Sequence, residues 1–240
     1  MALSLRLALI SALVPHGARV CDIGTDHGYL PIELIKRGDI KSVIATDIRE
    51  KPLANAEKNI KAAGVGGITL RLCDGLEGIA QAEVDTIITA GMGGEVIASI
   101  LARSPLPTAA PAPLLIMQPT TSPEFLRRFL CENSFVIIND TALCENAKLY
   151  SVITARYTGE KYSCGEEFYY CGKVDPQTED GAKYIEKQYL RLKKCADALE
   201  NIPEKREEYK RLAEISAALK KKLTENRNGI CRSIFTQNGN

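Results

Sequence analysis

Short apolar runs and longer amphipathic stretches alternate through the first two thirds of the chain. The apolar runs are rich in valine and isoleucine, which is typical of buried strands. The stretches between them repeat their apolar positions at helical spacing. We therefore expect strands at 20–23, 42–46, 68–72, 85–89 and 114–117, and helices at 31–36, 51–63, 95–102 and 123–131, with a short helix before the fourth strand. Strands that alternate with helices in this way predict an α/β fold with a mostly parallel sheet.

Two segments complete this sheet, and another precedes it. Residues 135–138 and 148–157 read as closing strands whose connection is too short for a crossover, so we expect them to be antiparallel. Leu3 to Val14 is apolar except for Arg6, and its leucines recur at helical spacing. A signal peptide is disfavoured there, because cleavage would leave the first strand nearly bare.

The character of the chain changes after Thr158. Residues 159–174 form an irregular aromatic connector, and 176–202 and 203–226 read as two long polar helices. Their apolar residues recur in steps of three and four, which predicts a narrow coiled-coil seam between antiparallel helices. We expect one α/β domain at 1–158, a connector and coiled-coil pair at 159–240, and disorder in the last residues.

Composition adds few constraints. The 240 residues are 45% hydrophobic, which suffices for a core, and the net charge of +1 favours no class of partner. The eight cysteines form no Cys-x-x-Cys pair and only two histidines could assist them, so no metal site is expected. Free thiols indicate a reducing, cytoplasmic location, and no run is long enough to span a membrane.

Carboxylates gather where the expected strands end. Asp22 lies at the end of the first strand and Asp26 just after it, and Asp47 and Asp74 follow the second and third strands. The carboxyl ends of parallel strands form the edge at which such sheets bind ligands. A pyrophosphate would be repelled by this edge, whereas S-adenosylmethionine (SAM) offers ribose hydroxyls, an amino group, an ammonium and a sulfonium. The pattern favours SAM over NAD.

The loop after the first strand resembles a glycine-rich turn in which Asp26 replaces the middle glycine. A turn of this kind is weak evidence alone, because it can simply join a strand to a helix. Asp47 lies 23 positions after Gly24, close to the offset at which an acid binds ribose hydroxyls. Asp74 and Gly75 suit an adenine amino group. The combination is more specific than its parts.

A second glycine cluster closes the fourth strand. Gly91, Met92 and Gly93 would let the backbone approach the methionine part of SAM, although glycines also serve helix packing. Gln118, after the fifth strand, is a candidate for the acceptor side, with an ordinary strand end as the alternative.

Three other features are open to two interpretations each. His27 beside Asp26 could act as a base, although a loop histidine is more often structural. Tyr29 could stack on a base or fill the core. The basic residues of the two terminal helices, including Lys220 to Lys222, could follow a phosphate backbone, but glutamates among them also fit a solvated surface.

These residues make the chain similar to the bacterial tRNA (adenine-N1)-methyltransferases of the TrmK type, which modify adenine 22 of tRNA. The resemblance covers almost the whole chain. It is carried by Ser4 and Arg6-Leu7, by DIGTDHGYLPIEL, RLCDGLE, ITAGMGG and MQP, and by Glu145 to Tyr150. Leu5 stands where a basic residue is usual, and Ala147 where glycine is expected.

The resemblance implies a class I SAM-dependent methyltransferase fold, SAM as cofactor and tRNA as partner. It implies that the coiled-coil pair holds the tRNA. We further expect no metal, no membrane contact, and a monomer or weak dimer. The residues expected to bind the cofactor are Asp22, Gly24, Asp26, Asp47, Ile48, Asp74, Gly75, Gly91, Met92 and Gly93. Those expected to face the adenine and act in catalysis are Asp26, His27, Tyr29 and Gln118.

Other functions remain open at this stage. One is a SAM-dependent enzyme that methylates another RNA or a small molecule. Another is an NAD-type oxidoreductase, which Asp26 disfavours because it stands where a phosphate would lie. A third is a tRNA-binding protein without catalytic activity.

Overall fold

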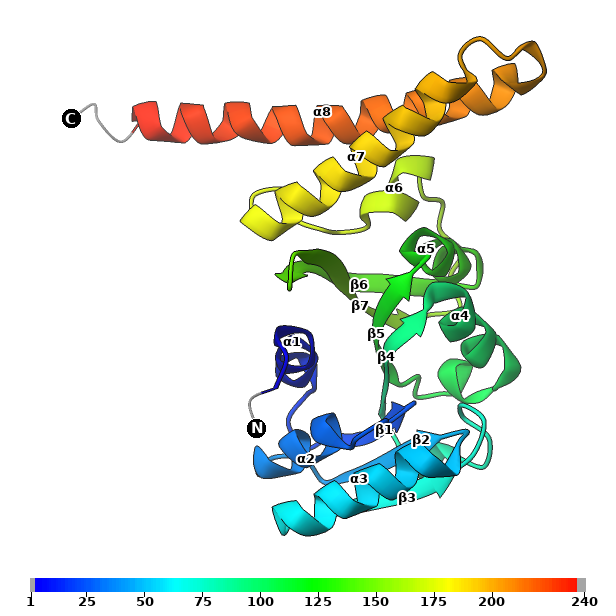
Figure 1. Cartoon of the computed structure of the whole chain (residues 1–240), viewed down its shortest axis with the longest axis vertical. Coiled ribbons are helices and arrows are strands. Elements are labelled where there is room, and N and C mark those ends of the chain that lie inside the picture. The colour runs from blue at the N-terminus through cyan, green and yellow to red at the C-terminus, as the bar shows by residue number, and fades with distance from the viewer. Residues whose placement is uncertain (1–2, 237–240) are drawn as a thin grey trace.

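A seven-stranded sheet forms the centre of the molecule, and a pair of long helices lies against one end of it (Figure 1). The computed structural model describes residues 3–236, with side chains up to residue 225. The strands are β1 (Arg19–Ile23), β2 (Ser42–Asp47), β3 (Ile68–Leu72), β4 (Thr86–Gly93), β5 (Leu114–Thr121), β6 (Phe135–Glu145) and β7 (Lys148–Tyr157). The helices are α1 (Leu5–Leu13), α2 (Tyr29–Lys36), α3 (Glu50–Ala63), α4 (Gly94–Arg103), α5 (Pro123–Glu132), α6 (Glu166–Cys171), α7 (Glu179–Leu199) and α8 (Arg206–Thr236). Short 3₁₀ turns lie at Gln81–Glu83, Leu106–Thr108 and Pro203–Lys205.

The strand order is β3-β2-β1-β4-β5-β7-β6. The first five strands are parallel, and β7 runs antiparallel to both β5 and β6. The predicted mostly parallel sheet with one antiparallel strand is therefore confirmed. The chain order reverses between β1 and β4, so the crevice at their carboxyl ends is the place where such sheets bind ligands.

Alternating side chains along the strands supply two separate cores. Ile87 packs in the cluster that includes residues of α4 and α5, whereas its neighbour Ile88 packs with residues of α1 and α2. Successive strand residues point to opposite faces, so a continuous apolar strand serves both layers at once. This explains why the strands read as unbroken apolar runs.

Several boundaries differ from the prediction; β4 and β5, for example, continue to Gly93 and Thr121. Three further differences change how the elements are connected. β6 continues to Glu145, so a tight turn at Asn146 and Ala147 joins it to β7 in place of a loop. The connector is not irregular throughout, because Glu166–Cys171 form α6. The first terminal helix starts at Glu179, where Thr178 accepts a hydrogen bond from the Gly181 N–H as its N-cap.

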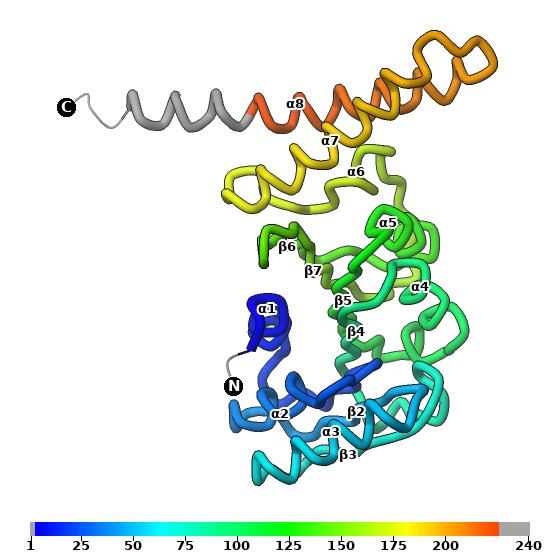
Figure 2. Tube along the Cα trace, viewed as in Figure 1, coloured from blue at the N-terminus to red at the C-terminus, as the bar shows by residue number. Residues whose placement is uncertain are grey.

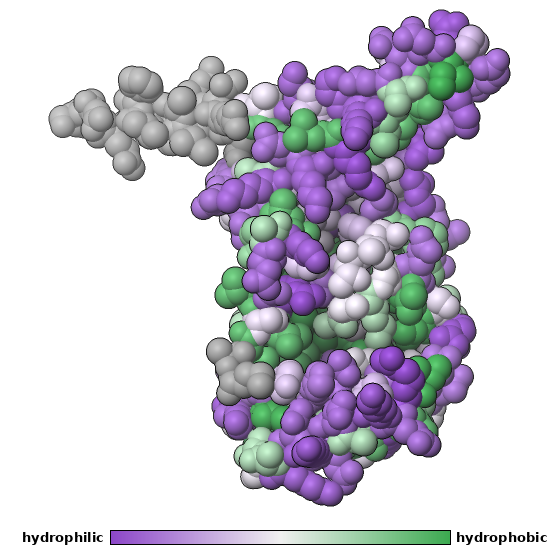
Figure 3. Space-filling view, in the orientation of Figure 1, coloured by the Kyte–Doolittle hydropathy of each residue, from purple (hydrophilic) through white to green (hydrophobic). Residues whose placement is uncertain are grey.

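α7 and α8 pack side by side in opposite directions (Figure 2). The predicted seam is buried: Ile185, Leu192 and Ala196 of α7 face a core that includes Ile215 and Leu219 of α8. The outer surface visible in Figure 3 is mostly hydrophilic. One apolar cluster joins this pair to α5, so the domain division at residue 158, like the supercoiling of the pair, stays a prediction.

Two expectations concern the ends and surface of the chain. The sequence predicts a disordered tail after Arg227, but α8 continues to Thr236, so this prediction is wrong for residues 228–236. Its remaining part falls on residues 237–240, which lie outside the described residues. Among the residues described, none of the helices combines the length and the apolar character that crossing a membrane requires.

Candidate functional site

A cavity of about 800 Å³ opens at the carboxyl ends of the five parallel strands β1 to β5. Its walls come from the loops after these strands and from the first turn of α1. The sequence-predicted residues that line it are Asp22, Gly24, Asp26, His27, Tyr29, Asp47, Ile48, Asp74, Gly75, Gly91, Met92 and Gln118. Residues predicted from separate segments of the chain therefore meet around one space.

Gly93 is placed differently from the other predicted residues. It is the N-cap of α4, and a Cβ added to it would lie 3.0 Å from Thr121 Oγ1. The structure thus gives this glycine a packing contact with β5 and does not place it on the cavity wall. Its contact with a cofactor remains a prediction.

The loop after β1 closes tightly over the strand ends. Gly24 and Thr25 both donate their N–H groups to the Thr46 carbonyl over 2.8 Å, which fixes the loop to β2. Gly24 has φ +79°, and a Cβ there would lie 2.2 Å from the Met92 Cε atom. Glycine adopts this left-handed conformation at little cost and leaves the room that the cavity floor needs.

Asp22 is a buried carboxylate, with a relative exposure of 5%. Burial raises its pKa to about 6, although a hydrogen bond from Thr25 acts in the opposite direction. No Lys or Arg side chain in the described part of the chain forms an ion pair with it. A carboxylate held in this way is suited to an organic cation that enters the cavity.

Asp47 and Ile48 form the next part of the wall. Asp47 is buried, and its Oδ1 accepts a hydrogen bond from the Arg49 backbone N–H over 2.8 Å. Ile48 is exposed to 63%, so it offers an apolar side chain to a flat ligand group inside the cavity. An acid followed by an apolar residue fits a ribose and its attached base.

Asp74 is paired with a side chain that the sequence did not suggest. Arg103, the last residue of α4, donates to both carboxylate oxygens, over 2.7 and 3.0 Å. These hydrogen bonds lower the pKa of Asp74. The carboxylate is therefore anionic and held in one orientation, and it retains lone pairs for an amino group.

Asp26, His27 and Tyr29 form an outer rim. The side chain of Asp26 is 64% exposed and its Oδ2 lies 3.4 Å from His27 Nε2. The rings of His27 and Tyr29 stack with centroids 5.2 Å apart and planes 15° from parallel. The rim presents aromatic faces beside a solvated carboxylate, which suits an incoming nucleobase.

The Gln118 side chain is buried, and its amide oxygen and one of its two amide hydrogens have hydrogen-bond partners. Its Oε1 accepts hydrogen bonds from Arg6 Nη1, over 3.1 Å, and from the Gly91 N–H, over 3.2 Å. Its Nε2 donates to the Pro119 carbonyl. One amide hydrogen is left for a ligand. The side chain thus holds the wall together, and its predicted action in catalysis stays a prediction.

Arg6 is a site residue that was not among the predicted catalytic and cofactor residues. Its Nε donates to Glu145 Oε2 over 2.6 Å, and its guanidinium lies 4.6 Å from the ring centroid of Tyr150. It therefore joins α1 to β5 and to the β6–β7 turn. The signal in the sequence was a single cation in an otherwise apolar helix. The other wall residues that were not predicted are Ser4, Leu7, Ile23, Thr25, Gly28, Leu30, Thr46, Arg49, Cys73, Ala90, Val96 and Ile100.

Comparison with known proteins places these features in a family. Residues 3–153 match the family described as "Methyltransferase domain". The tRNA (adenine(22)-N(1))-methyltransferase of Bacillus subtilis is 34% identical over 154 residues, which are 64% of this chain and 64% of the length of that enzyme.

Two solved structures agree over nearly the whole chain. A candidate tRNA (m1A22) methyltransferase from Streptococcus pneumoniae is 34% identical, with a TM-score of 0.80, over 92% of this chain and 100% of its own. A structure of the same protein with S-adenosyl-L-methionine aligns with 32% identity and a TM-score of 0.76 over the same shares.

Proposed function

Because the chain belongs to the methyltransferase domain family, and within it to the bacterial tRNA (adenine-N1)-methyltransferases of the TrmK type, we propose that it is a SAM-dependent enzyme that methylates N1 of adenine 22 in tRNA. The observation that carries the proposal is the acid-lined cavity at the switch point of the sheet, with an aromatic rim at its mouth.

The cavity fits SAM in its charges and its shape. The buried Asp22 faces no cation in the described residues and so suits the ammonium of the methionine part. Asp47 suits the ribose hydroxyls, and Asp74 suits the adenine amino group. A Cβ built on Gly91 would meet nothing within 4 Å, so the backbone there is open to a ligand.

The chemistry places modest demands on the protein. Bound SAM supplies a methyl group on a sulfonium. Adenine N1 carries a lone pair and no proton, so the protein does not need to supply a general base. Its residues would align the base with the methyl group and stabilise the positive charge that the ring acquires. We assign that stabilisation to Asp26, which lies on the rim beside His27 and Tyr29.

The substrate is proposed to be a folded RNA. N1 lies on the Watson–Crick edge, so the base must leave its stack to reach the cavity. His27 and Tyr29 would stack on the base, and the α7–α8 pair, with its exposed lysines and arginines, would hold the RNA body. We place the enzyme in the cytoplasm, where tRNA is available.

A methylation assay tests the proposal. Unmodified tRNA transcripts with adenine or guanine at position 22 are incubated with labelled SAM, and the labelled nucleoside is identified. We expect 1-methyladenosine with the first transcript and no label with the second. Equal labelling of both transcripts would reject position 22 as the target. Labelling of small metabolites without RNA would reject tRNA as the substrate and favour a small-molecule methyltransferase.

Cofactor choice is tested separately. SAM is expected to raise the melting temperature progressively as its concentration increases above the dissociation constant, with a logarithmic dependence, while NAD leaves the melting temperature unchanged. Stabilisation by NAD alone would favour the oxidoreductase alternative.

A further inference from the structure

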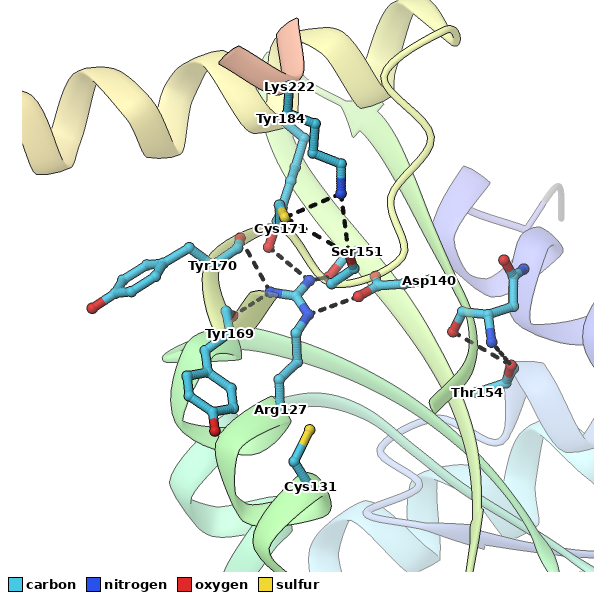
Figure 4. Close-up of polar contacts among 12 residues, drawn as sticks. Arg127, Cys131, Asp140, Ser151, Thr154, Tyr169, Tyr170, Cys171, Tyr184 and Lys222 are labelled. Atoms are coloured by element: carbon cyan, nitrogen blue, oxygen red, sulfur yellow. Dashed lines mark hydrogen bonds and ion pairs between the residues drawn. The ribbon is translucent and has the colours of Figure 1, made fainter. Parts of the chain in front are cut away.

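The guanidinium of Arg127 lies at the boundary between the sheet and the terminal helices (Figure 4). This residue of α5 has a relative exposure of 0%. Its Nε donates to Asp140 Oδ2 over 2.7 Å, and its Nη2 donates to Ser151 Oγ and to the Tyr184 hydroxyl, over 2.9 and 3.1 Å. Its Nη1 donates to the carbonyls of Tyr169 and Tyr170, over 3.0 and 3.3 Å.

These partners come from both sides of the boundary. Asp140 and Ser151 belong to β6 and β7 of the sheet, whereas Tyr184 belongs to α7 and the two carbonyls to α6. A guanidinium has five N–H groups, and here each has an acceptor. A single side chain is therefore hydrogen-bonded to the sheet, to the connector and to the helical pair.

The last helix reaches the same place. Lys222 of α8 donates from Nζ to the Gly172 carbonyl and to Cys171 Sγ, over 3.5 and 3.4 Å. The Gly172 backbone lies so close to the Asp140 carboxylate that an added Cβ would be 2.0 Å from Oδ2. Two cations thus converge on the end of α6 from different helices, and the glycine allows the approach.

Such a cluster defines geometry more than it adds stability. Replacing a buried ion pair by apolar residues is often neutral or stabilising. The Oδ1 atom of Asp140 has no hydrogen-bond partner among the described residues, so the cluster is not arranged for the strongest possible pairing. Apolar surfaces can slide past one another, whereas the planar guanidinium requires its acceptors in fixed directions.

We propose that Arg127 is a positioning residue that fixes the orientation of the α7–α8 pair relative to the cavity, and thereby where an RNA held by the pair presents its target base. The inference rests on the proposed tRNA methylation. Arg127 does not line the cavity, so it acts on the reaction only through the placement of the helices.

Two mild variants test the proposal without leaving a buried charge unpaired. Arg127→Lys keeps the positive charge but loses the planar guanidinium with its five N–H groups. Tyr184→Phe removes only the hydrogen bond to α7. Tyr189→Phe is the matched control, because it removes a hydroxyl from the same helix without touching Arg127. We expect both test variants to lower kcat/KM for tRNA at least fivefold with the dissociation constant for SAM within twofold of wild type. The control keeps wild-type values.

A distance measurement reports the orientation itself. Spin labels are attached through unnatural amino acids at Glu204, at the tip of the helical pair, and at Lys41 on the methyltransferase domain, and their separation is measured by pulsed electron paramagnetic resonance. Wild type and Tyr189→Phe are expected to give one narrow distribution, and Arg127→Lys and Tyr184→Phe broader ones.

The outcomes separate the two proposals. Unchanged distances in both test variants, or a loss of SAM affinity parallel to the loss of activity, would overturn the positioning role. The wild type could instead bind SAM but methylate no tRNA. Broader distance distributions in the two test variants would then support the positioning role, while the missing activity would reject the proposed substrate.

Discussion

Arg6 Nη1 donates to Gln118 Oε1 over 3.1 Å, so the first helix of the chain is tied directly to the end of β5. The same oxygen accepts the Gly91 N–H, which belongs to the carboxyl-terminal part of β4. Two hydrogen bonds therefore connect α1 to the wall on which the reacting methyl group would lie. The following prediction tests that connection.

The double variant Arg6→Gln/Glu145→Gln removes both charges of the pair, so no buried carboxylate is left alone. We expect kcat/KM for tRNA to fall about tenfold or more, because hydrogen bonds from a charged donor are worth roughly 1.5–3 kcal/mol. SAM affinity should change less than threefold. Arg19→Gln/Asp85→Asn removes a half-exposed pair that does not line the cavity and serves as control. Equal losses in both double variants would remove the special role of Arg6.

Asp22→Asn should stabilise the protein without ligand at neutral pH. The pKa of Asp22 is about 6 in the folded protein and 3.8 in its ordinary state. The folded chain therefore binds the proton more tightly, and stability falls as pH rises from about 4 to above 6. The variant should gain up to about 3 kcal/mol at pH 7.5 and little at pH 4. Urea unfolding at both values measures this, and a gain independent of pH would contradict the assignment.

The same carboxylate should make SAM binding depend on pH. Only ionised Asp22 attracts the ammonium of SAM, so the affinity of the wild type should decrease as pH is lowered through about 6. Asp22→Asn should bind more weakly at pH 7.5 and show a flatter profile. Titration calorimetry between pH 5 and 8 measures both. A wild-type profile as flat as that of the variant would argue against an Asp22–ammonium contact.

Arg103→Gln tests the orientation of Asp74. Removing the guanidinium raises the pKa of Asp74 toward its ordinary value, which still leaves the carboxylate ionised at pH 7. We expect SAM to bind about fivefold more weakly, because a carboxylate that is no longer held in one orientation should lose roughly 1 kcal/mol of binding free energy. Stability should change by less than about 1 kcal/mol, because the pair is partly exposed. An unchanged SAM affinity would show that Asp74 does not need this partner.

Ala147→Gly should make the chain more stable. Asn146 and Ala147 form the turn between β6 and β7 with φ values of +51° and +59°. A left-handed conformation costs an alanine roughly 1–2 kcal/mol, and Asn-Gly is the preferred pair in such turns. Thermal unfolding should therefore show a gain of about 1 kcal/mol. The glycine that the resemblance leads us to expect at this position would adopt the same backbone geometry at lower cost.

The fold was largely predictable because its determinants are local. Val and Ile runs and helix ends such as Gly64 mark the elements, and the alternation of strands and helices implies the sheet. The acids at the strand ends could be assigned to one edge because parallel strands share it. Each of these inferences needs only neighbouring residues and a general rule of topology.

The residues that were missed depend on partners far along the chain. In the sequence, Arg127 is one of two adjacent arginines in an expected helix, and nothing near it reveals the buried Asp140 that pairs with it. Arg103 and Arg6 likewise acquire their functions from Asp74 and Gln118. Side-chain pairing across elements is a property of the assembled fold, and a single sequence contains no local pattern for it.

Asp22 also has a consequence for the lifetime of the polypeptide. A buried carboxylate without a cationic partner makes the empty enzyme unfold locally more often than the SAM-bound enzyme, and proteases cleave unfolded segments. Limited digestion should therefore proceed more slowly as the methyl donor is added. In a cell short of that donor, the enzyme would be degraded sooner, so its abundance would follow the supply of the molecule it consumes.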